Sequence, residues 1–173
     1  PTTPRPATGA FALDWVLPGL RGGEAPLATV ASRDAKERLA FLRQAVPERS
    51  AASSTRRQGR AAKVRLAQGA PFNNYVGASI ELKNAGTGPW RTWLLLVEKL
   101  PAGTEGSPVE RHLVRNVFRP DWDRPVSRRP DRLAEMRAMQ IHAGAKAERL
   151  RLVAVVHDHD GRLRSVVHTD CGE

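Results

Sequence analysis

The sequence predicts a mainly β protein with one or two helices, in which an antiparallel β-sandwich-like domain follows an N-terminal strand-helix segment. Short apolar runs recur through the second half of the chain, some alternating strictly with polar residues, and Pro- and Gly-rich turns separate them. The clearest helical stripe of apolar residues lies between positions 32 and 46. With 173 residues, 40% of them hydrophobic and 27% charged, the chain is long enough for one domain with its own core.

The N-terminal part predicts a tail, a strand and a helix. Residues 1–9 contain three prolines, three threonines and little to bury, which is typical of an extended tail. Residues 10–17, AFALDWVL, predict a buried strand that stops at the following Pro-Gly pair. Within the strand-helix segment 10–47, Ser32 is expected to cap a helix that ends before Pro47. The apolar stripe of this helix comprises Ala35, Leu39, Leu42 and Val46.

Residues 48–61 have no apolar periodicity and predict a basic linker or loop, and residues 62–173 are assigned to the β-sandwich-like domain. Within that domain residues 76–82, VGASIEL, alternate between inward and outward positions. The inward positions are Val76, Ala78, Ile80 and Leu82. The turn NAGTGP at residues 84–89 joins this run to the next strand, and we expect the two strands to pair antiparallel.

The run at residues 90–100, WRTWLLLVEKL, is apolar on both sides in its middle, which predicts a central strand that is covered on both faces. The odd-numbered apolar residues are expected to face one layer, and the even-numbered ones the other layer or a covering helix. The two sets are Trp93, Leu95 and Val97, and Leu94 and Leu96. Residues 108–118 predict a third strand and residues 119–132 a loop, while residues 133–144 leave helix and strand open.

The C-terminal stretch at residues 153–171, VAVVHDHDGRLRSVVHTDC, predicts a β-hairpin. Asp160-Gly161 is a strong signal for a two-residue turn, because both central positions of that turn need a positive φ. This turn would pair Val153 with His168.

The same hairpin contains the residues that could bind a metal ion. The candidates are His157, His159, His168 and Cys171. The predicted register places an arginine opposite each of the first two histidines, Arg164 and Arg162, and two guanidinium groups oppose binding of a divalent cation. Along the strand, His168 would lie roughly 13 Å from the position opposite the first histidine, at ~3.4 Å per residue. We therefore favour an exposed hairpin tip without a metal. The lone cysteine would be a free thiol or form an intermolecular link.

The formal net charge of +10 and the pI of about 11.1 raise the possibility of an anionic polymer as partner. Only five of the 28 basic residues are lysines, and this Arg- and Ala-rich composition is also what a GC-rich genome gives without selection for a partner. Aromatic residues are 5% of the chain, too few for a platform that stacks single-stranded bases. The residues available for an anionic polymer are Arg56, Arg57, Arg60, Lys63 and Arg65.

Motifs for catalysis are not found in the sequence. It has no phosphate-binding glycine loop, no serine-nucleophile elbow, no redox Cys-x-x-Cys and no zinc-binding helix motif, and we assign no catalytic residue and no cofactor. Asp121 and Asp123 lie among prolines and arginines and are expected to form ion pairs. The longest apolar run, residues 93–97, is far shorter than the ~18 residues of a membrane span.

The order of LLLVEKL, ERHLVRNVF and LRLVAVVHDHDGRLRSVVHTDC resembles that in a group of secreted bacterial thioredoxin-like proteins of largely unknown function. In those proteins a Cys-x-x-Cys thioredoxin domain is followed by, or interleaved with, a β-sandwich. The resemblance covers residues 76–169 and implies that residues 139–144, MQIHAG, are a strand and that His112 and Arg115 have a structural or partner-contact role. The redox pair is missing here, so the thiol–disulfide chemistry of that family transfers to no residue of this chain.

The sequence thus favours a non-enzymatic β-sandwich module that is periplasmic or secreted and binds another protein, or a larger complex, as an accessory or stabilising subunit. The alternative is a binder of nucleic acid or polysaccharide through the basic stretch at residues 56–65. A metal-dependent activity of the C-terminal hairpin ranks last.

Overall fold

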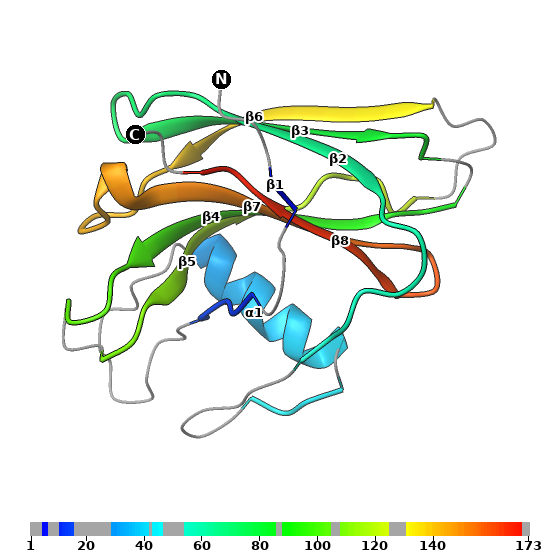
Figure 1. Ribbon diagram of the computed structural model, residues 1–173, viewed down its shortest axis with the longest axis horizontal. Coiled ribbons are helices and arrows are strands. Elements are labelled where there is room, and N and C mark those ends of the chain that lie inside the picture. The colour runs from blue at the N-terminus through cyan, green and yellow to red at the C-terminus, as the bar shows by residue number, and fades with distance from the viewer. Residues whose placement is uncertain are drawn as a thin grey trace.

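The computed structural model describes residues 5–6, 11–15, 29–41, 43–46, 54–85, 88–104, 108–124 and 131–170. In these residues two antiparallel sheets pack face to face and a helix covers the other side of the larger sheet, which confirms the predicted β-rich fold class (Figure 1). The strands are β1 (Arg5–Pro6), β2 (Lys63–Gln68), β3 (Tyr75–Lys83), β4 (Arg91–Leu100), β5 (Arg111–Phe118), β6 (Arg132–Gln140), β7 (Leu150–His157) and β8 (Leu163–His168), and the helices are α1 (Thr29–Phe41) and the 3-10 helix η1 (Ala147–Arg149).

The five-stranded sheet has the order β1-β8-β7-β4-β5, and the three-stranded sheet has the order β2-β3-β6. The predicted pairing of residues 76–82 with residues 90–100 is therefore wrong, because β3 and β4 belong to different sheets. The segment between them carries the chain from one sheet to the other, and within it the Trp90 indole N–H donates to the Ala85 carbonyl at 2.6 Å. A strand that is apolar on both faces, as β4 is, needs a central position in a sheet that is covered on both sides.

The core between the two sheets is formed by the inward-facing side chains of both. The four inward residues of β3 are each exposed by 1% or less, as their alternation predicts. They pack against the even-numbered apolar residues of β4 and against residues of β7. The buried residues of this core are Leu66, Val76, Ala78, Ile80, Leu82, Ala85, Leu94, Leu96, Trp122, Met139, Leu150, Leu152, Ala154 and Val167. The predicted β-sandwich is therefore present.

A second core covers the opposite face of the five-stranded sheet. The odd-numbered apolar residues of β4 lie here, so its two faces are divided as predicted. The helix covers the odd-numbered side, however, and not the even-numbered side to which the prediction assigned a possible helix. The Phe41 ring of α1 lies 6.2 Å from the Trp93 ring of β4. Residues 11–15 pack beside α1, and the Asp14 N–H donates to a β5 carbonyl at 2.8 Å. In the described residues the predicted strand 10–17 is limited to a single parallel bridge.

The helix differs from its predicted boundaries at both ends. α1 begins before Ser32, which therefore lies inside the helix and not at its cap. The helix ends because Arg43 adopts a φ of 55° and the Gln44 N–H donates back to the Leu39 carbonyl at 2.8 Å, an arrangement typical of helix C-termini. Val46 lies beyond this point and is 56% exposed, so it takes no part in the apolar stripe.

The remaining sequence predictions concern single segments. Residues 133–144, for which helix and strand were both open, are strand only as far as Gln140, the last residue of β6. The strand that the resemblance implies for residues 139–144 is therefore wrong for residues 141–144. Of the predicted tail only residues 5–6 are described, and they pair with β8. Leu42 and Cys171 lie outside the described residues. Among the helices that the structure describes, none has the length and hydrophobicity needed to cross a membrane.

Candidate functional site

The three-stranded sheet turns one face toward the sandwich core and the other toward solvent. Side chains alternate along each strand, and residues paired across antiparallel strands share a face. We define the outer face as the solvent-side residues of this sheet, which are Lys63, Arg65, Ala67, Tyr75, Gly77, Ser79, Glu81, Lys83, Arg132, Ala134, Met136, Ala138 and Gln140. This surface collects residues from three separate parts of the sequence.

One end of the outer face is cationic. Lys63, Lys83 and Arg132 lie side by side, because they are paired in register across the three strands. Glu81 in the next row lies 3.4 Å from the Lys83 ammonium and 2.7 Å from the Arg132 guanidinium. Lys63 and Arg65 form no ion pair with another described residue. Four cations therefore face one carboxylate at this end of the sheet.

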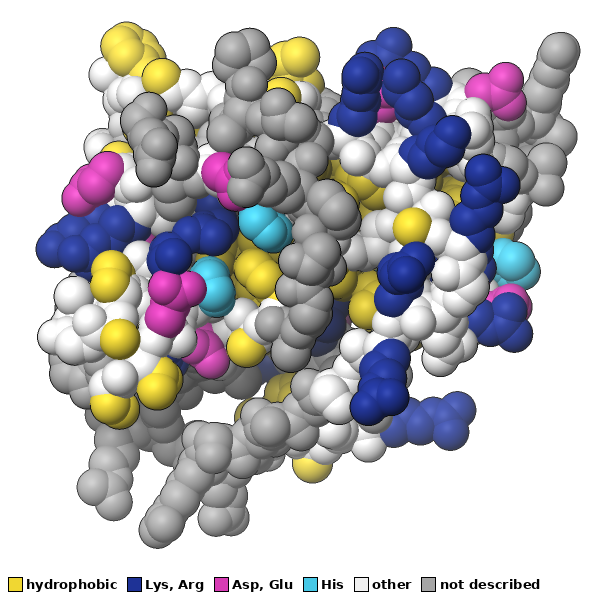
Figure 2. All heavy atoms as spheres, viewed as in Figure 1, with side chains coloured by type: hydrophobic (Ala, Val, Ile, Leu, Met, Phe, Trp, Pro, Cys, Tyr) yellow, Lys and Arg dark blue, Asp and Glu magenta, His cyan; other side chains and the backbone are white. Residues whose placement is uncertain are grey.

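Exposed apolar side chains occupy the middle and the other end of the outer face. Met136 of β6 is 77% exposed and lies in the middle row, opposite Ser79. Tyr75 at the start of β3 is 45% exposed, and Phe72 in the adjoining β2–β3 turn is 75% exposed. Around Met136, the positions between the two ends are mostly small residues, namely Ala67, Gly77, Ser79, Ala134 and Ala138. Figure 2 shows hydrophobic side chains at the upper left, over the β2–β3 turn, and Lys and Arg side chains at the upper right, over the opposite end of the sheet.

The β2–β3 turn holds the exposed Phe72 in a defined position. Phe72 and Tyr75 exchange backbone hydrogen bonds of 2.8 and 2.9 Å, and Asn73 and Asn74 between them have φ values of 46° and 62°. Two successive positive φ values define the tight hairpin turn that asparagine tolerates well. This turn was not predicted from the sequence, although two asparagines between two aromatic residues were its signal.

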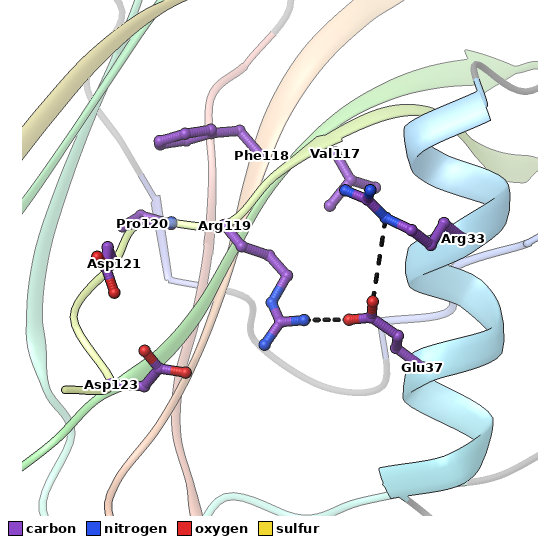
Figure 3. Close-up of a pocket in the computed structure, with 8 residues that line it drawn as sticks. All are labelled: Arg33, Glu37, Val117, Phe118, Arg119, Pro120, Asp121 and Asp123. Atoms are coloured by element: carbon purple, nitrogen blue, oxygen red, sulfur yellow. Dashed lines mark hydrogen bonds and ion pairs between the residues drawn. The ribbon is translucent and has the colours of Figure 1, made fainter.

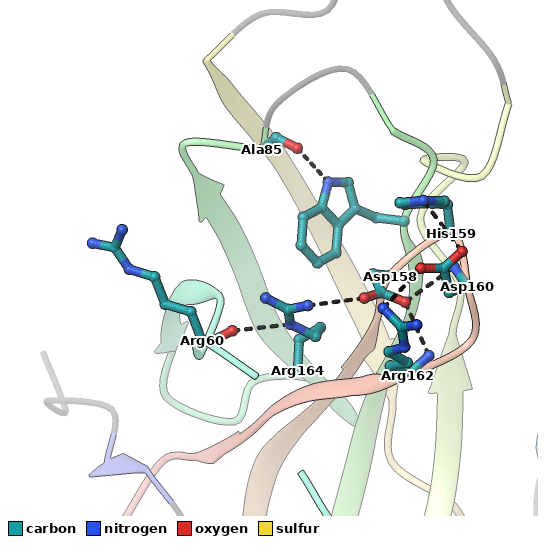
Figure 4. Close-up of polar contacts among 8 residues, drawn as sticks. Arg60, Ala85, Asp158, His159, Asp160, Arg162 and Arg164 are labelled. Carbon is teal, nitrogen blue, oxygen red and sulfur yellow. Dashed lines mark hydrogen bonds and ion pairs between the residues drawn. The ribbon is translucent and has the colours of Figure 1, made fainter. Parts of the chain in front are cut away.

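The five basic residues predicted to bind an anionic polymer are divided between two places. Lys63 and Arg65 lie on the outer face, while Arg56, Arg57 and Arg60 are exposed in the irregular segment that precedes β2. Hydrogen bonds with β8 hold that segment in place. In Figure 4 the guanidinium of Arg60 points away from the β7–β8 hairpin, although its carbonyl accepts a hydrogen bond from that hairpin.

The β7–β8 hairpin forms in the predicted place but with a different turn. The Gly161 N–H donates to the Asp158 carbonyl at 3.0 Å, and the Asp158 N–H donates to the Arg162 carbonyl at 3.1 Å. Gly161 has a φ of 76°, and no other residue of the turn has a positive φ. These features define a three-residue turn, so the predicted two-residue turn at Asp160-Gly161 is wrong. The strand register shifts by one residue beside His157. Beyond this shift, away from the turn, the two strands pair in the predicted register.

Asp158 organises this turn. One carboxylate oxygen accepts the N–H groups of Asp160 and Arg162 at 3.0 and 2.9 Å, and the other accepts the Arg164 guanidinium at 3.0 Å (Figure 4). Burial of the 6% exposed Asp158 opposes its ionisation, but the hydrogen bonds from Arg162, Arg164 and Asp160 outweigh burial and lower its pKa. His159 extends from the tip of the turn and is exposed. The aspartates of the turn therefore serve its structure.

His157 is buried, in contrast to the exposed hairpin tip that the sequence predicts. It is 5% exposed, and its ring meets the rings of Trp93 at 5.2 Å and Phe41 at 5.9 Å, both edge-on. Its partner across the hairpin is Leu163 and not the predicted arginine, because the turn is one residue longer. Burial, followed by the positive charge of Arg38, lowers the pKa of His157 to about 4. Its Nδ1 atom is buried without a hydrogen-bond partner among the described residues.

The structure does not bring the four candidate metal ligands together in its described part. His157 lies in the second core, His159 lies at the exposed tip, and His168 stacks on Phe11 at 5.5 Å. Cys171 is outside the described residues. Within the described ranges, no three His, Cys, Asp or Glu side chains are grouped as a metal site requires.

Arg115 and His112 lie on opposite faces of the five-stranded sheet. Arg115 is 5% exposed, and its Nε donates at 2.7 Å to Glu98, whose side chain is fully buried. Glu98 also accepts the Lys146 N–H at 3.0 Å, so the buried pair connects two strands with the loop before η1. His112 instead stacks on Phe11, with ring centroids 4.8 Å apart.

A pocket of about 380 Å³ lies between α1 and the segment after β5. Figure 3 shows its charged residues, and the Glu37 carboxylate at its wall is bonded to Arg119 and lies 4.0 Å from Arg33. Asp121 forms an ion pair with Arg124 at 3.0 Å, as the sequence predicts for this stretch. Arginines thus engage Glu37 and Asp121, whereas Asp123, which the sequence also predicts to be paired, forms no ion pair with another described residue.

No protein-family model, curated protein or solved structure matches the chain. Among the described surfaces, the outer face combines exposed large apolar side chains with a row of cations.

Proposed function

We propose that this protein is a non-enzymatic binding module whose outer face docks a partner protein. The observation that carries the proposal is the exposure of Met136, Tyr75 and Phe72, by 77%, 45% and 75%, on the solvent side of one sheet, from its middle row to its β2–β3 end. Large apolar side chains that gather on one surface favour contact with another protein, because the partner removes them from water.

The outer face is suited to binding because its anchors are held before a partner arrives. Tyr75 lies in β3, the central strand of the sheet, and Phe72 is fixed by the tight turn. Aromatic side chains lose little conformational entropy on binding, so burying them increases affinity strongly. The small residues around Met136 allow a partner to approach the backbone of the sheet.

The charges indicate the chemistry of the partner. The cationic end, with Lys63, Arg65, Lys83 and Arg132 against Glu81, favours a partner that presents carboxylates beside an apolar patch. A second copy of this chain would oppose cation to cation at that end, and the net charge of +10 adds to the repulsion. We therefore propose an acidic protein of a different kind as partner.

The proposal extends to the role of the module. Following the family that the strand motifs resemble, we place it in the periplasm or outside the cell, as an accessory or stabilising subunit of its partner.

Affinity purification of the full chain from the cells that produce it tests the proposed function. Met136→Glu places a charge at the exposed apolar residue in the middle of the outer face and should lower recovery of the partner by about tenfold or more. Val109→Glu is the matched control, since Val109 is an apolar residue that is 61% exposed and precedes a strand of the other sheet. Equal recovery of the same partner by wild type and Met136→Glu would refute the proposal.

A second candidate function is binding of an anionic polymer, and the row formed by Lys63, Lys83 and Arg132 favours it specifically. Fluorescence anisotropy with a labelled DNA duplex over a range of salt concentrations tests this candidate. Substitution of both lysines by Gln should reduce the salt dependence by about one ion per lost contact, while Arg124→Gln should not.

The same titration separates the segment before β2 from the outer face. Joint substitution of Arg56, Arg57 and Arg60 by Gln reports on that segment alone. Salt dependence that none of these substitutions changes would exclude a specific polymer site among these residues.

A further inference from the structure

Arg151 of β7 is a buried cation without a counter-ion. The residue is 8% exposed, and its Nε atom is buried without a hydrogen-bond partner. Among the described residues, no hydrogen bond or ion pair engages its guanidinium. An unpaired charge inside a protein is costly, and buried arginines are therefore normally paired with a carboxylate or another anion.

Arg151 lies on the side of the sheet that α1 covers, because it is paired with Val97 of β4. Arg151 shares this face with Val153 and the other odd-numbered residues of β7. His112 of β5 and His168 of β8 lie on either side of the β7–β4 pair, and Phe11 stacks on both histidines, at 4.8 and 5.5 Å. The Phe11 ring therefore bridges the row of strands to which Arg151 belongs.

The acidic groups around Arg151 already have other partners. Glu110 forms an ion pair with Lys99 at 2.9 Å, and Asp14 forms one with Arg111 at 2.9 Å. On the β8 side, the Asp170 carboxylate lies 3.8 Å from the Nδ1 atom of His168.

The positive charge of Arg151 shifts the pKa values of two neighbouring side chains, His112 and Glu110. The pKa of His112 is lowered, first by burial and second by the positive charge of Arg151. The pKa of Glu110 is also lowered, mainly by the hydrogen bond from Lys99 and with a smaller contribution from Arg151. Positive potential thus extends from Arg151 over both side chains.

We propose that Arg151, with His112 and His168, binds a small oxyanion, either a phosphate or a carboxylate. A guanidinium presents paired N–H donors that match the oxygens of these groups, and an imidazole adds a single donor on each side. The positive charge excludes a metal cation. This site lies on the opposite side of the molecule from the outer face and is independent of the function proposed for it.

Thermal unfolding of the full chain in increasing sodium phosphate, at constant ionic strength maintained with sodium chloride, tests the site. The melting temperature of the wild type should rise saturably. Arg151→Gln should bind phosphate at least tenfold more weakly and lose this rise. Arg124→Gln, which removes a cation whose side chain is 78% exposed, should behave like the wild type. A parallel series in sodium acetate shows which oxyanion the site prefers, and no rise with either anion overturns the proposal.

A second measurement uses the wild type only, in case Arg151→Gln does not fold. In an NMR titration with phosphate, the Arg151 Nε–H resonance should shift saturably, and the Arg124 Nε–H resonance should not. Binding at the cationic end of the outer face would shift the Arg65 and Arg132 resonances and leave Arg151 unchanged. That result, or a phosphate-dependent rise in melting temperature that persists in Arg151→Gln, overturns the proposal.

Discussion

His157 is a neutral histidine in an aromatic environment, and its burial makes the stability of the protein depend on pH. Its pKa is about 4 in the folded state and 6.5 in an ordinary environment. Below pH 6.5 the unfolded chain takes up a proton that the folded chain does not accept until about pH 4. The contribution of His157 is thus fully present above pH 6.5 and is lost as the pH falls to 4, and the lowered pKa of His112 acts in the same direction.

We expect the free energy of unfolding to fall by about 3 kcal/mol between pH 6.5 and pH 4 through His157 alone. Urea unfolding at a series of pH values measures this loss. His157→Gln should show a flatter pH profile than the wild type, whereas Val109→Ala, at a position that is 61% exposed, should not change the slope. A wild-type profile that is flat over this range would contradict the neutral, buried state of His157.

The stability of the protein should respond differently to the same substitution at the buried His157 and at the exposed His159. His159→Gln changes an exposed side chain and should shift stability by less than about 0.5 kcal/mol. His157→Gln replaces a ring packed on Trp93 and Phe41, and should cost on the order of 1–3 kcal/mol at neutral pH. His157→Phe keeps the packing and removes the unpartnered Nδ1, so it should be better tolerated than the glutamine. Chemical denaturation of the three variants at pH 7.5 checks this order.

At the scale of elements, the β7–β8 turn depends on Gly161. A β-branched residue is strongly disfavoured at its φ of 76°, so Gly161→Val should cost on the order of 1–3 kcal/mol. The cost comes from the backbone, because a Cβ atom there would meet Phe41 at an ordinary 3.5 Å. Gly161→Asn should cost less, since asparagine adopts positive φ more readily. Equal melting temperatures for the valine and asparagine variants would show that the turn differs from the one described.

The central strand β4 supports both cores, and Leu95 lies fully buried in its middle. Leu95→Ala should cost about 2–5 kcal/mol, the range for buried leucines. Val109→Ala, at a position that is 61% exposed, is the control and should stay within about 0.5 kcal/mol. A cost below ~1 kcal/mol for Leu95→Ala would show that β4 is not an interior strand covered on both faces.

Elements whose structure is determined by neighbouring residues in the sequence could be predicted, and those that depend on distant residues or on single dihedral angles could not. The burial of β3 and the two faces of β4 follow from alternation within one run of residues, and both were predicted. The partner of β3 was not, because sequence proximity favoured a hairpin while burial on both faces required β4 to lie in the other sheet. The end of α1 and the turn at Gly161 each depend on the backbone dihedral angle of one residue. The residue type at that position does not by itself fix the angle, so neither feature could be predicted.

At the scale of the whole molecule, the two candidate sites depend on long-range pairing. The outer face brings together β2, β3 and β6, and the Arg151 site brings residue 11 against β5 and β8. Neither arrangement has a motif in one stretch of sequence. Composition indicated a basic surface, and the basic residues of β2 were among those predicted, but Lys83, Arg132 and Met136 join them only through the strand register.

The central claim is that the outer face contacts a partner protein, and site-specific photo-crosslinking tests it most directly. Benzoylphenylalanine is introduced at position 136, and in a second protein at position 109, and the full chain is irradiated in the cells that produce it. We expect a discrete adduct with a different, acidic protein from position 136, lost when Phe72→Ser is added, and no such adduct from position 109. No discrete adduct from position 136, or the same adducts from both positions, would contradict the claim. An adduct with the mass of two copies of this chain would contradict the proposed acidic partner.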